Sequence, residues 1–254
     1  MTVHFYNESD RDDWDRYVVD HNSASCYHLT GWKDVIEESF GHRTFYLLSR
    51  DEAGAIDGIL PLVHLNSLLF GNFAVSLPFF NYGGICADSD GIRDGLFEEA
   101  ARFARTRGMA HLELRHSEDL LPGVPVKTSK VSMRLALPGT KEELNASFPS
   151  KLRSQVRRAV KEGMVARMGG QEELGSFHSV FSRNMRDLGT PVYSRRFFRA
   201  ILERFPDAAR ICTVYTREGM PVASGMIVGF RDTLEIPWAS SLKIGRASCR
   251  ERVY

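Results

Sequence analysis

The sequence predicts a mixed α/β (α+β) protein in which one domain occurs twice. Apolar residues alternate at strand spacing in some stretches and recur at helical spacing in others. Two stretches, FYLLSRDEAGAIDGILPLV and ICTVYTREGMPVASGMIV, share an apolar strand, a charged turn and a returning strand with an interior glycine. Glycine is costly inside a strand and usually marks a bulge or a close backbone approach. The matched positions of Gly58 and Gly225 therefore favour duplication over chance similarity of two hairpins.

Composition limits the classes of protein that the chain can represent. Its 254 residues are 43% hydrophobic, which suits one large domain or two small ones. A formal net charge of +1 argues against bulk binding of polyanions such as DNA. The four cysteines are far apart, and no His/Cys spacing suggests a metal site or a disulfide framework. The acidic start has no apolar segment typical of a signal peptide, so we expect a cytoplasmic protein.

Residues 1–138 are the expected first domain. Residues 3–6 form a short strand, and Ser9 can cap a helix over residues 9–20. A helix over residues 32–40 stops at Gly41. Apolar patterns then predict a strand, a turn and a returning strand, a further strand, a helix closed by Gly108, and two last strands. These elements lie at residues 44–49, 51–54, 55–65, 73–77, 89–107, 111–115 and 131–137.

Residues 58–87 contain no Asp, Glu, Lys or Arg. An uncharged stretch of this length would be long enough to span a membrane. Proline, glycine and asparagine residues interrupt this run, for example at Pro61, Gly71 and Pro78. Such residues divide a segment into short strands and turns. Buried sheet is therefore the favoured interpretation of this stretch.

Residues 139–242 are the expected second domain. Thr140 and Glu143 form a capping-box pattern, and residues 150–163 predict a basic helix. Apolar residues at helical spacing predict helices over residues 171–188 and 194–205. Strands are expected at residues 210–216, 221–230 and 233–239.

The last of these strands matches residues 73–77, and residues 78–137 have no counterpart after it. We therefore expect the second domain to be truncated and this chain to be inactive. Residues 243–254 lose all apolar periodicity and contain four basic residues and one acidic residue. The stretch IGRASCRERV within them resembles a translated sequencing adaptor, so a non-native tail is expected. A genuine basic tail is the alternative, and without these residues the formal net charge is −2.

The order of helices, hairpin and strand–loop–helix resembles the GNAT acyltransferase fold. Its duplication resembles the FemAB family of peptide-bridge aminoacyltransferases. Four stretches are similar in particular to FemAB-like proteins associated with PEP-CTERM/exosortase systems: DGILPLVHLNSLLFGNFAVSLPFFNYGGICAD, HLELR, SRNMRDLGTPVYSRRFF and EIPWASSL. The resemblance covers residues 2–242 and implies tandem GNAT domains, the second truncated.

The resemblance implies transfer of an acyl or aminoacyl group to an amine that attacks the acyl carbonyl directly. Catalysis then consists of positioning, carbonyl polarisation and removal of one proton. The implied acceptor is a cell-envelope precursor, either a peptidoglycan peptide or an exopolysaccharide-linked amine. The implied donor is aminoacyl-tRNA or acyl-CoA, with no cofactor bound permanently. The charged heptad insertion of several Fem enzymes is absent from the sequence, which counts against tRNA.

The resemblance also implies peripheral contact with the inner membrane from the cytoplasmic side. The alternative function is a non-catalytic GNAT-fold protein that binds an envelope or exopolysaccharide precursor.

Glu235 is the candidate catalytic residue. It is a carboxylate in the otherwise apolar strand 233–239, and GNAT enzymes often carry a base glutamate on this strand. The alternative is an outward-facing glutamate on a half-exposed sheet. Trp238, on the same strand, is a candidate substrate-binding residue.

A loop between a strand and the helix that starts near residue 89 offers hydrogen-bonding groups and two glycines that permit close backbone approach. Its candidate substrate-binding residues are Asn81, Tyr82, Gly83 and Gly84. The alternative is a glycine-rich connector packed by its aromatic residues. Arg115 could clamp a carboxylate or phosphate, or instead pair with Glu113 on its own strand.

A second group of candidate substrate-binding residues ends one helix and starts a loop. These residues are Arg183, Asn184, Arg186 and Tyr193. Basic residues that complement the helix dipole are the alternative interpretation. On the helix over residues 150–163, Arg153, Arg157 and Lys161 form a stripe that could contact tRNA or undecaprenyl phosphate, with a solvated helix face as the alternative.

Overall fold

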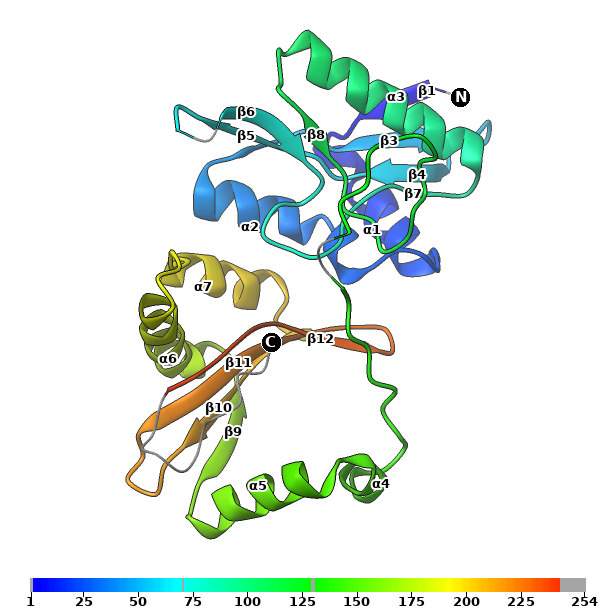
Figure 1. Cartoon of the computed structure of the whole chain (residues 1–254). Coiled ribbons are helices and arrows are strands. Elements are labelled where there is room, and N and C mark those ends of the chain that lie inside the picture. Colours follow the sequence, from blue (N-terminus) through cyan, green and yellow to red (C-terminus); the bar gives the residue numbers. More distant parts are fainter. Residues whose placement is uncertain (1, 70, 129–130, 243–254) are drawn as a thin grey trace. The chain divides into compact units, whose positions relative to one another are not determined.

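A computed structural model describes residues 2–69, 71–128 and 131–242. The chain forms two compact units, residues 1–128 (unit 1) and residues 129–254 (unit 2), each with helices packed on sheets (Figure 1). The predicted mixed α/β class is therefore confirmed. The predicted domain boundary at residue 138 lies inside unit 2 and stays a prediction. The predicted non-native tail, residues 243–254, lies outside the described residues.

Unit 1 contains two four-stranded sheets, of order β1-β3-β4-β7 and β2-β5-β6-β8. Helices α1 and α3 pack against the first sheet from opposite sides (Figure 1). The elements are β1 (Thr2–Phe5), α1 (Arg11–Asp20), α2 (Gly31–Phe40), β2 (Arg43–Thr44), β3 (Leu47–Arg50), β4 (Ile56–Leu60), β5 (Val63–Ser67), β6 (Gly71–Val75), β7 (Cys86–Ala87), α3 (Asp90–Thr106) and β8 (Leu112–Glu113).

The first predicted hairpin is divided between these two sheets. β3 pairs with β4 in one sheet, whereas β2 pairs with β5 in the other. The division falls at Pro61, which has no N–H to continue a ladder. One backbone bond, from the Phe45 N–H to the Leu62 carbonyl (2.7 Å), joins the two chain segments at this point.

Gly58 permits the close approach that its position in a strand predicts. A Cβ atom there would lie 2.5 Å from Cγ2 of Ile92 and 3.0 Å from Cδ1 of Leu96, both on α3. A bulge lies directly beside it, because Ser49 pairs with Gly58 and Arg50 pairs with Ile56. The glycine therefore lets α3 rest on β4 and bury Leu96.

The uncharged stretch over residues 58–87 contributes to strands β4, β5, β6 and β7. Within the parts of the chain that the structure covers, no helix is both long and apolar enough to cross a membrane.

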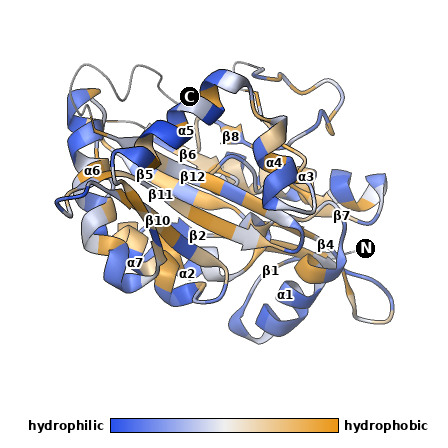
Figure 2. Ribbon diagram, turned by 90° about the horizontal axis from the view of Figure 1, so that it is seen from below, coloured by the Kyte–Doolittle hydropathy of each residue, from blue (hydrophilic) through white to orange (hydrophobic). Residues whose placement is uncertain are grey.

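Unit 2 contains one antiparallel sheet of order β12-β11-β10-β9. Alternate residues of β11, such as Val222, Met226 and Val228, are buried on the face where α6 packs. In Figure 2, β10 and β11 are largely hydrophobic, whereas α5 is mostly hydrophilic. The elements are α4 (Lys141–Ser147), α5 (Ser150–Lys161), β9 (Val165–Gly169), α6 (Leu174–Asp187), α7 (Arg195–Arg204), β10 (Ala209–Tyr215), β11 (Pro221–Phe230) and β12 (Thr233–Ser241).

Gly225 has a different environment from Gly58. The three atoms nearest to a Cβ atom there all belong to β12, with Cγ2 of Ile236 and the Trp238 carbonyl oxygen both at 3.4 Å. These are ordinary contacts. In the described part of unit 2, the matched glycine therefore does not serve a helix–strand approach.

The strand predicted over residues 131–137 is wrong. The structure gives these residues no regular secondary structure. Their alternating apolar side chains are exposed, Val131 by 87%. Alternation indicates a strand only where a neighbouring strand completes the ladder and one face is covered, and no described strand pairs with this segment.

Candidate functional site

Strand β12 carries a bulge beside Glu235. Met226 pairs with Trp238 and Val228 pairs with Glu235, so Ile236 and Pro237 together oppose one residue of β11. Proline cannot donate to a ladder, and an extra residue is tolerated at a bulge. Bulges of this kind redirect the side chains that follow them.

The bulge brings Glu235 and Trp238 to one face of the sheet. Three residues apart in a regular strand, they would point to opposite faces. Both instead lie opposite buried residues of β11, Val228 and Met226, and therefore share the face on which α6 packs. This face differs from the outward orientation considered as the alternative for Glu235.

Helix α6 places one predicted residue against this strand. Asn184 donates a hydrogen bond from Nδ2 to Oγ of Ser240 on β12 (3.2 Å). Arg183 and Arg186 lie on the exposed side of the same helix. Arg186 is paired with Asp187 at 3.2 Å and its side chain is 71% exposed, so it is available to a ligand in solution.

Tyr193 and Trp238 belong to an aromatic cluster. The Trp238 ring meets Phe197 and Phe198 edge-on, with centroids 5.4 Å apart in each case. Tyr193 lies 5.3 Å from Phe197 and stacks on Phe181. Trp238 is buried, so its side chain contributes mainly to packing within unit 2. The structure therefore brings Glu235, Asn184, Trp238 and Tyr193 to one region of unit 2 and leaves the two arginines on its surface.

In unit 1, Arg115 binds the loop that contains the other predicted residues. Its Nη1 donates to the Phe80 carbonyl oxygen, and its Nε donates to Glu113 Oε1 (2.7 Å). The Glu113–Arg115 pair considered as an alternative is thus present. Asn81 is exposed and Tyr82 is half-buried, while Gly83 and Gly84 are buried.

Two histidines that the sequence analysis missed hold the same loop. His28 donates from Nε2 to the Gly84 carbonyl oxygen (3.0 Å), because its Nδ1 accepts the Ser25 N–H. His116 Nε2 accepts the Ile85 N–H (2.9 Å). A Cβ atom at Gly84 would lie 2.2 Å from the His116 ring, which explains the glycine. Burial lowers the pKa of both His28 and His116 to about 4.

Unit 2 also contains a buried polar network that the sequence did not indicate. The Tyr215 hydroxyl donates to Glu173 Oε2 (2.6 Å) and contacts Ser176 Oγ (2.9 Å). Burial, followed by the bond to Glu173, raises the pKa of Tyr215. The Arg167 guanidinium lies 4.7 Å from the Tyr215 ring centroid. Arg167 lies on β9, a strand too short and polar to be predicted.

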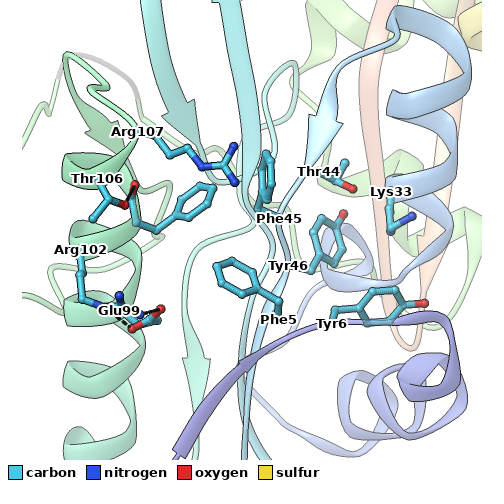
Figure 3. A pocket seen from close by; sticks show the side chains of 11 residues that line it. Phe5, Tyr6, Lys33, Thr44, Phe45, Tyr46, Glu99, Arg102, Thr106 and Arg107 are labelled. Atoms are coloured by element: carbon cyan, nitrogen blue, oxygen red, sulfur yellow. Dashed lines mark hydrogen bonds and ion pairs between the residues drawn. The ribbon is translucent and has the colours of Figure 1, made fainter.

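A pocket of about 430 Å³ lies in unit 1, and none of the predicted residues lines it (Figure 3). Phe5, Phe45 and Phe103 form its apolar part. The Arg107 guanidinium lies 5.2 and 5.1 Å from the ring centroids of Phe45 and Phe103. The buried hydroxyl of Tyr46 has no hydrogen-bond partner within the described chain. The residues that line this pocket come from four separate segments of the chain, so no sequence motif could have indicated the pocket.

Comparison with known proteins bears on unit 2 directly. Residues 146–242 match the family model described as an acetyltransferase (GNAT) domain. This range begins in α4 and ends after β12, so it includes Glu235, Trp238 and all the predicted residues of α6. No curated protein matches the chain.

Among solved structures, that of FemX matches with a TM-score of 0.66 at 13% identity, over 96% of this chain and 81% of that one. L-PGS from Bacillus licheniformis matches with a TM-score of 0.46 at 11% identity, over 85% and 69%. A GNAT family acetyltransferase of Staphylococcus aureus matches with a TM-score of 0.36 at 15% identity, over 53% and 98%. At these identities a likeness shows fold alone, and only the FemX match is high enough to use. The chain therefore shares the fold of FemX, carries a GNAT acetyltransferase domain and is an acyltransferase.

Proposed function

We propose that this protein transfers an acyl group to the amine of a cell-envelope precursor, with the reacting atoms beside β12 of unit 2. The observation that carries this proposal is the position of Glu235 within the matched acetyltransferase domain. It is a carboxylate next to a bulge, on the helix-covered face of the sheet.

The chemistry needs one base and a positioned amine. GNAT acetyltransferases use acyl-CoA as donor, and acyl-CoA is accordingly our first candidate, ahead of aminoacyl-tRNA. The amine nitrogen attacks the acyl carbonyl, the new C–N bond forms, and the C–S bond breaks to release the thiolate. Glu235 accepts the proton that the attacking nitrogen loses. The released thiolate is then protonated from solvent.

Exposed cations near this strand support an anionic acceptor. Arg183 and Arg186 present guanidinium groups on the solvent side of α6, and arginine binds carboxylates and phosphates in bidentate fashion. We propose that they bind the acidic groups of a peptidoglycan peptide. Asn81 and Tyr82, on a unit 1 loop that Arg115 holds in place, stay predicted substrate-binding residues. An exopolysaccharide-linked acceptor and the exosortase context stay predictions.

The test compares Glu235→Gln with Glu203→Gln, because Glu203 is an exposed glutamate on α7. Because the sequence predicts that this chain is truncated and inactive, the variants are made in a form extended by the genomic sequence beyond Leu242. The assays are binding of acetyl-CoA by calorimetry and transfer of labelled acetyl groups to an amine-bearing muropeptide, repeated with aminoacyl-tRNA. Loss of a general base lowers kcat by about 100-fold or more. We expect this loss in E235Q alone, with donor affinity unchanged.

Equal activity of E235Q and E203Q would contradict the role of Glu235. Absence of binding of either donor would contradict the proposed function itself. Binding of a precursor with no transfer from either donor would favour a non-catalytic binding protein.

We further propose that α5 makes the peripheral membrane contact. This helix carries an exposed apolar stripe of Leu152, Val156 and Val160. Val160 is 68% exposed to solvent. Arg153, Arg157 and three further basic residues flank it, and a basic amphipathic helix of this kind binds anionic lipid surfaces. Vesicles rich in phosphatidylglycerol should co-sediment the protein, and Val156→Asp should abolish this. Equal binding of V156D would contradict the contact.

A further inference from the structure

A cysteine, a histidine and an aspartate form a line on unit 1, far in sequence from the residues proposed for acyl transfer. The Cys86 Sγ atom lies 2.9 Å from His21 Nδ1. On the other side of the imidazole ring, His21 Nε2 lies 3.3 Å from Asp88 Oδ1. The three side chains come from β7, the end of α1 and the residue after β7, respectively. Among the described residues no group of this kind qualifies as a metal site.

The hydrogen bonds assign the proton on the imidazole. The backbone N–H of Ser23 donates to His21 Nδ1 (3.3 Å), so Nδ1 carries a lone pair and Nε2 carries the hydrogen. Nε2 therefore donates to Asp88, and Nδ1 can accept the Cys86 thiol hydrogen. A nucleophile, a base and a carboxylate that orients the base are the arrangement that activates a thiol.

Hydrogen bonds hold the groups of this line in place. His21 is the C-terminal cap of α1, where its own N–H bonds to the Tyr17 carbonyl. The Tyr17 hydroxyl donates to Asp88 Oδ1 (2.9 Å) and fixes this carboxylate beside the ring. The Ser23 hydroxyl lies 3.0 Å from His21 Nδ1 and 3.3 Å from Cys86 Sγ, so it can donate to the neutral imidazole or, once His21 has taken the thiol proton, to the thiolate.

The Cys86 thiol is buried, but the residues around it are partly exposed. Cys86 is 1% exposed, whereas the side chains of His21 and Asp88 are 20% and 50% exposed. β7 is a two-residue strand at the edge of its sheet, and Ser23 beside it is exposed. Because Sγ is covered in this way, we expect only a small reagent to reach it.

We propose that Cys86 is a redox-modification site whose thiol is activated by His21 and Asp88 and whose reactant is a small hydroperoxide. His21 Nδ1 takes the thiol proton, and the thiolate sulfur attacks one oxygen of hydrogen peroxide. The S–O bond forms and the O–O bond breaks. The leaving hydroxide takes the proton back from His21. The sum is Cys–SH plus H₂O₂ giving Cys–SOH plus H₂O, in which the sulfur is oxidised and the peroxide is the oxidant.

The test measures oxidation of each cysteine separately. The whole protein is exposed to hydrogen peroxide, then denatured in dimedone, and the labelled peptides are quantified by mass spectrometry. Cys212 is the internal comparison, because it is more exposed than Cys86 while burial raises the pKa of its thiol. We expect Cys86 to be labelled at least about 10-fold faster than Cys212.

Two variants test the assignment of roles. His21→Gln removes the base and should slow Cys86 oxidation by about 100-fold, the lower range for general-base catalysis. Asp88→Asn, at a half-exposed position, keeps the shape and should move the pH profile of the oxidation rate to higher pH. Labelling of Cys86 no faster than Cys212, or an unchanged profile in D88N, would overturn the proposal. Thermal melting identifies a variant that has lost its fold, and D88N then decides the question alone.

Discussion

Acidification should destabilise unit 1 through the two histidines that hold its glycine loop. His28 and His116 are neutral in the folded state because burial lowers the pKa of each to about 4. In the unfolded chain a histidine takes up a proton near pH 6.5. The stabilisation is therefore complete above about pH 6.5 and is lost as the pH falls toward about 4. At pH 5 the contribution of each histidine to the free energy of unfolding has fallen by about 2 kcal/mol. This follows because pH 5 lies about 1.5 units below the pKa of histidine in the unfolded chain, and each unit corresponds to about 1.36 kcal/mol.

The assay is urea unfolding at pH 7.5 and pH 5.0, followed by tryptophan fluorescence. Trp14 and Trp32 lie in unit 1 and Trp238 in unit 2, so the Trp238→Phe variant reports on unit 1 alone. Its free energy of unfolding should fall by about 4 kcal/mol between the two pH values. Adding His116→Gln, whose amide oxygen can still accept the Ile85 N–H, should reduce this fall to about 2 kcal/mol.

Asp15 acts in the opposite sense, since burial raises the pKa of its carboxyl. Asp15 is present in the Trp238→Phe variant both with and without His116→Gln, so its contribution cancels when the two are compared. An equal pH dependence with and without His116 would refute the reasoning.

Three further changes should alter stability in defined directions. Tyr46→Phe removes a buried hydroxyl without a partner in the described residues and should raise the free energy of unfolding by about 1 kcal/mol, seen as a higher urea midpoint. A lower midpoint would contradict this. Gly58→Ala forces a methyl group against Ile92 and should cost about 1–3 kcal/mol, whereas Gly225→Ala should cost clearly less. Equal costs would show that the glycine contacts do not matter. Trp238→Ala should lower the stability of unit 2 by about 3–5 kcal/mol in chemical unfolding followed by circular dichroism, and a loss below about 1 kcal/mol would remove Trp238 from the core.

Helix ends could be predicted from the sequence because their signals are local. Thr140 accepts the capping hydrogen bond expected of it, the helix expected from residue 89 begins after Ser89, which caps it, and Gly41 adopts the left-handed backbone that ends α2. The first helix is an exception, since Asn7 rather than Ser9 accepts the capping bond before α1. Such choices between neighbouring polar residues depend on backbone geometry that a sequence pattern does not contain.

Sheet partners could not be predicted, because pairing depends on distant segments. The two-residue strand β7 and the polar strand β9 show too little alternation to be recognised. Residues 131–137 alternate well but have no described partner. The predicted strands over residues 44–49 and 55–65 are each divided between two sheets. The only sequence signal for this division is Pro61, which cannot donate to a ladder.

Part of the candidate site could be predicted from residue type. Glu235 was selected as a carboxylate in an apolar strand, and its register places it on the helix-covered face. The residues that hold the loop in unit 1 were missed, because His28 and His116 are separated from Gly84 in sequence. Arg115 was selected for its charge, yet the structure shows two partners from the protein itself.

The bulge at Ile236 and Pro237 changes the parity of β12. Up to Glu235, odd-numbered residues face the helices, whereas from Trp238 onward even-numbered residues do so. Deleting one of these two residues would leave Glu235 and Trp238 two positions apart, and regular alternation would then keep both side chains on the helix-covered face. A double deletion would make them neighbours and turn either the carboxylate or the tryptophan to the other face. Loss of one residue at this point should therefore be tolerated more readily than loss of two, a rule that would be invisible to any substitution at Glu235 itself.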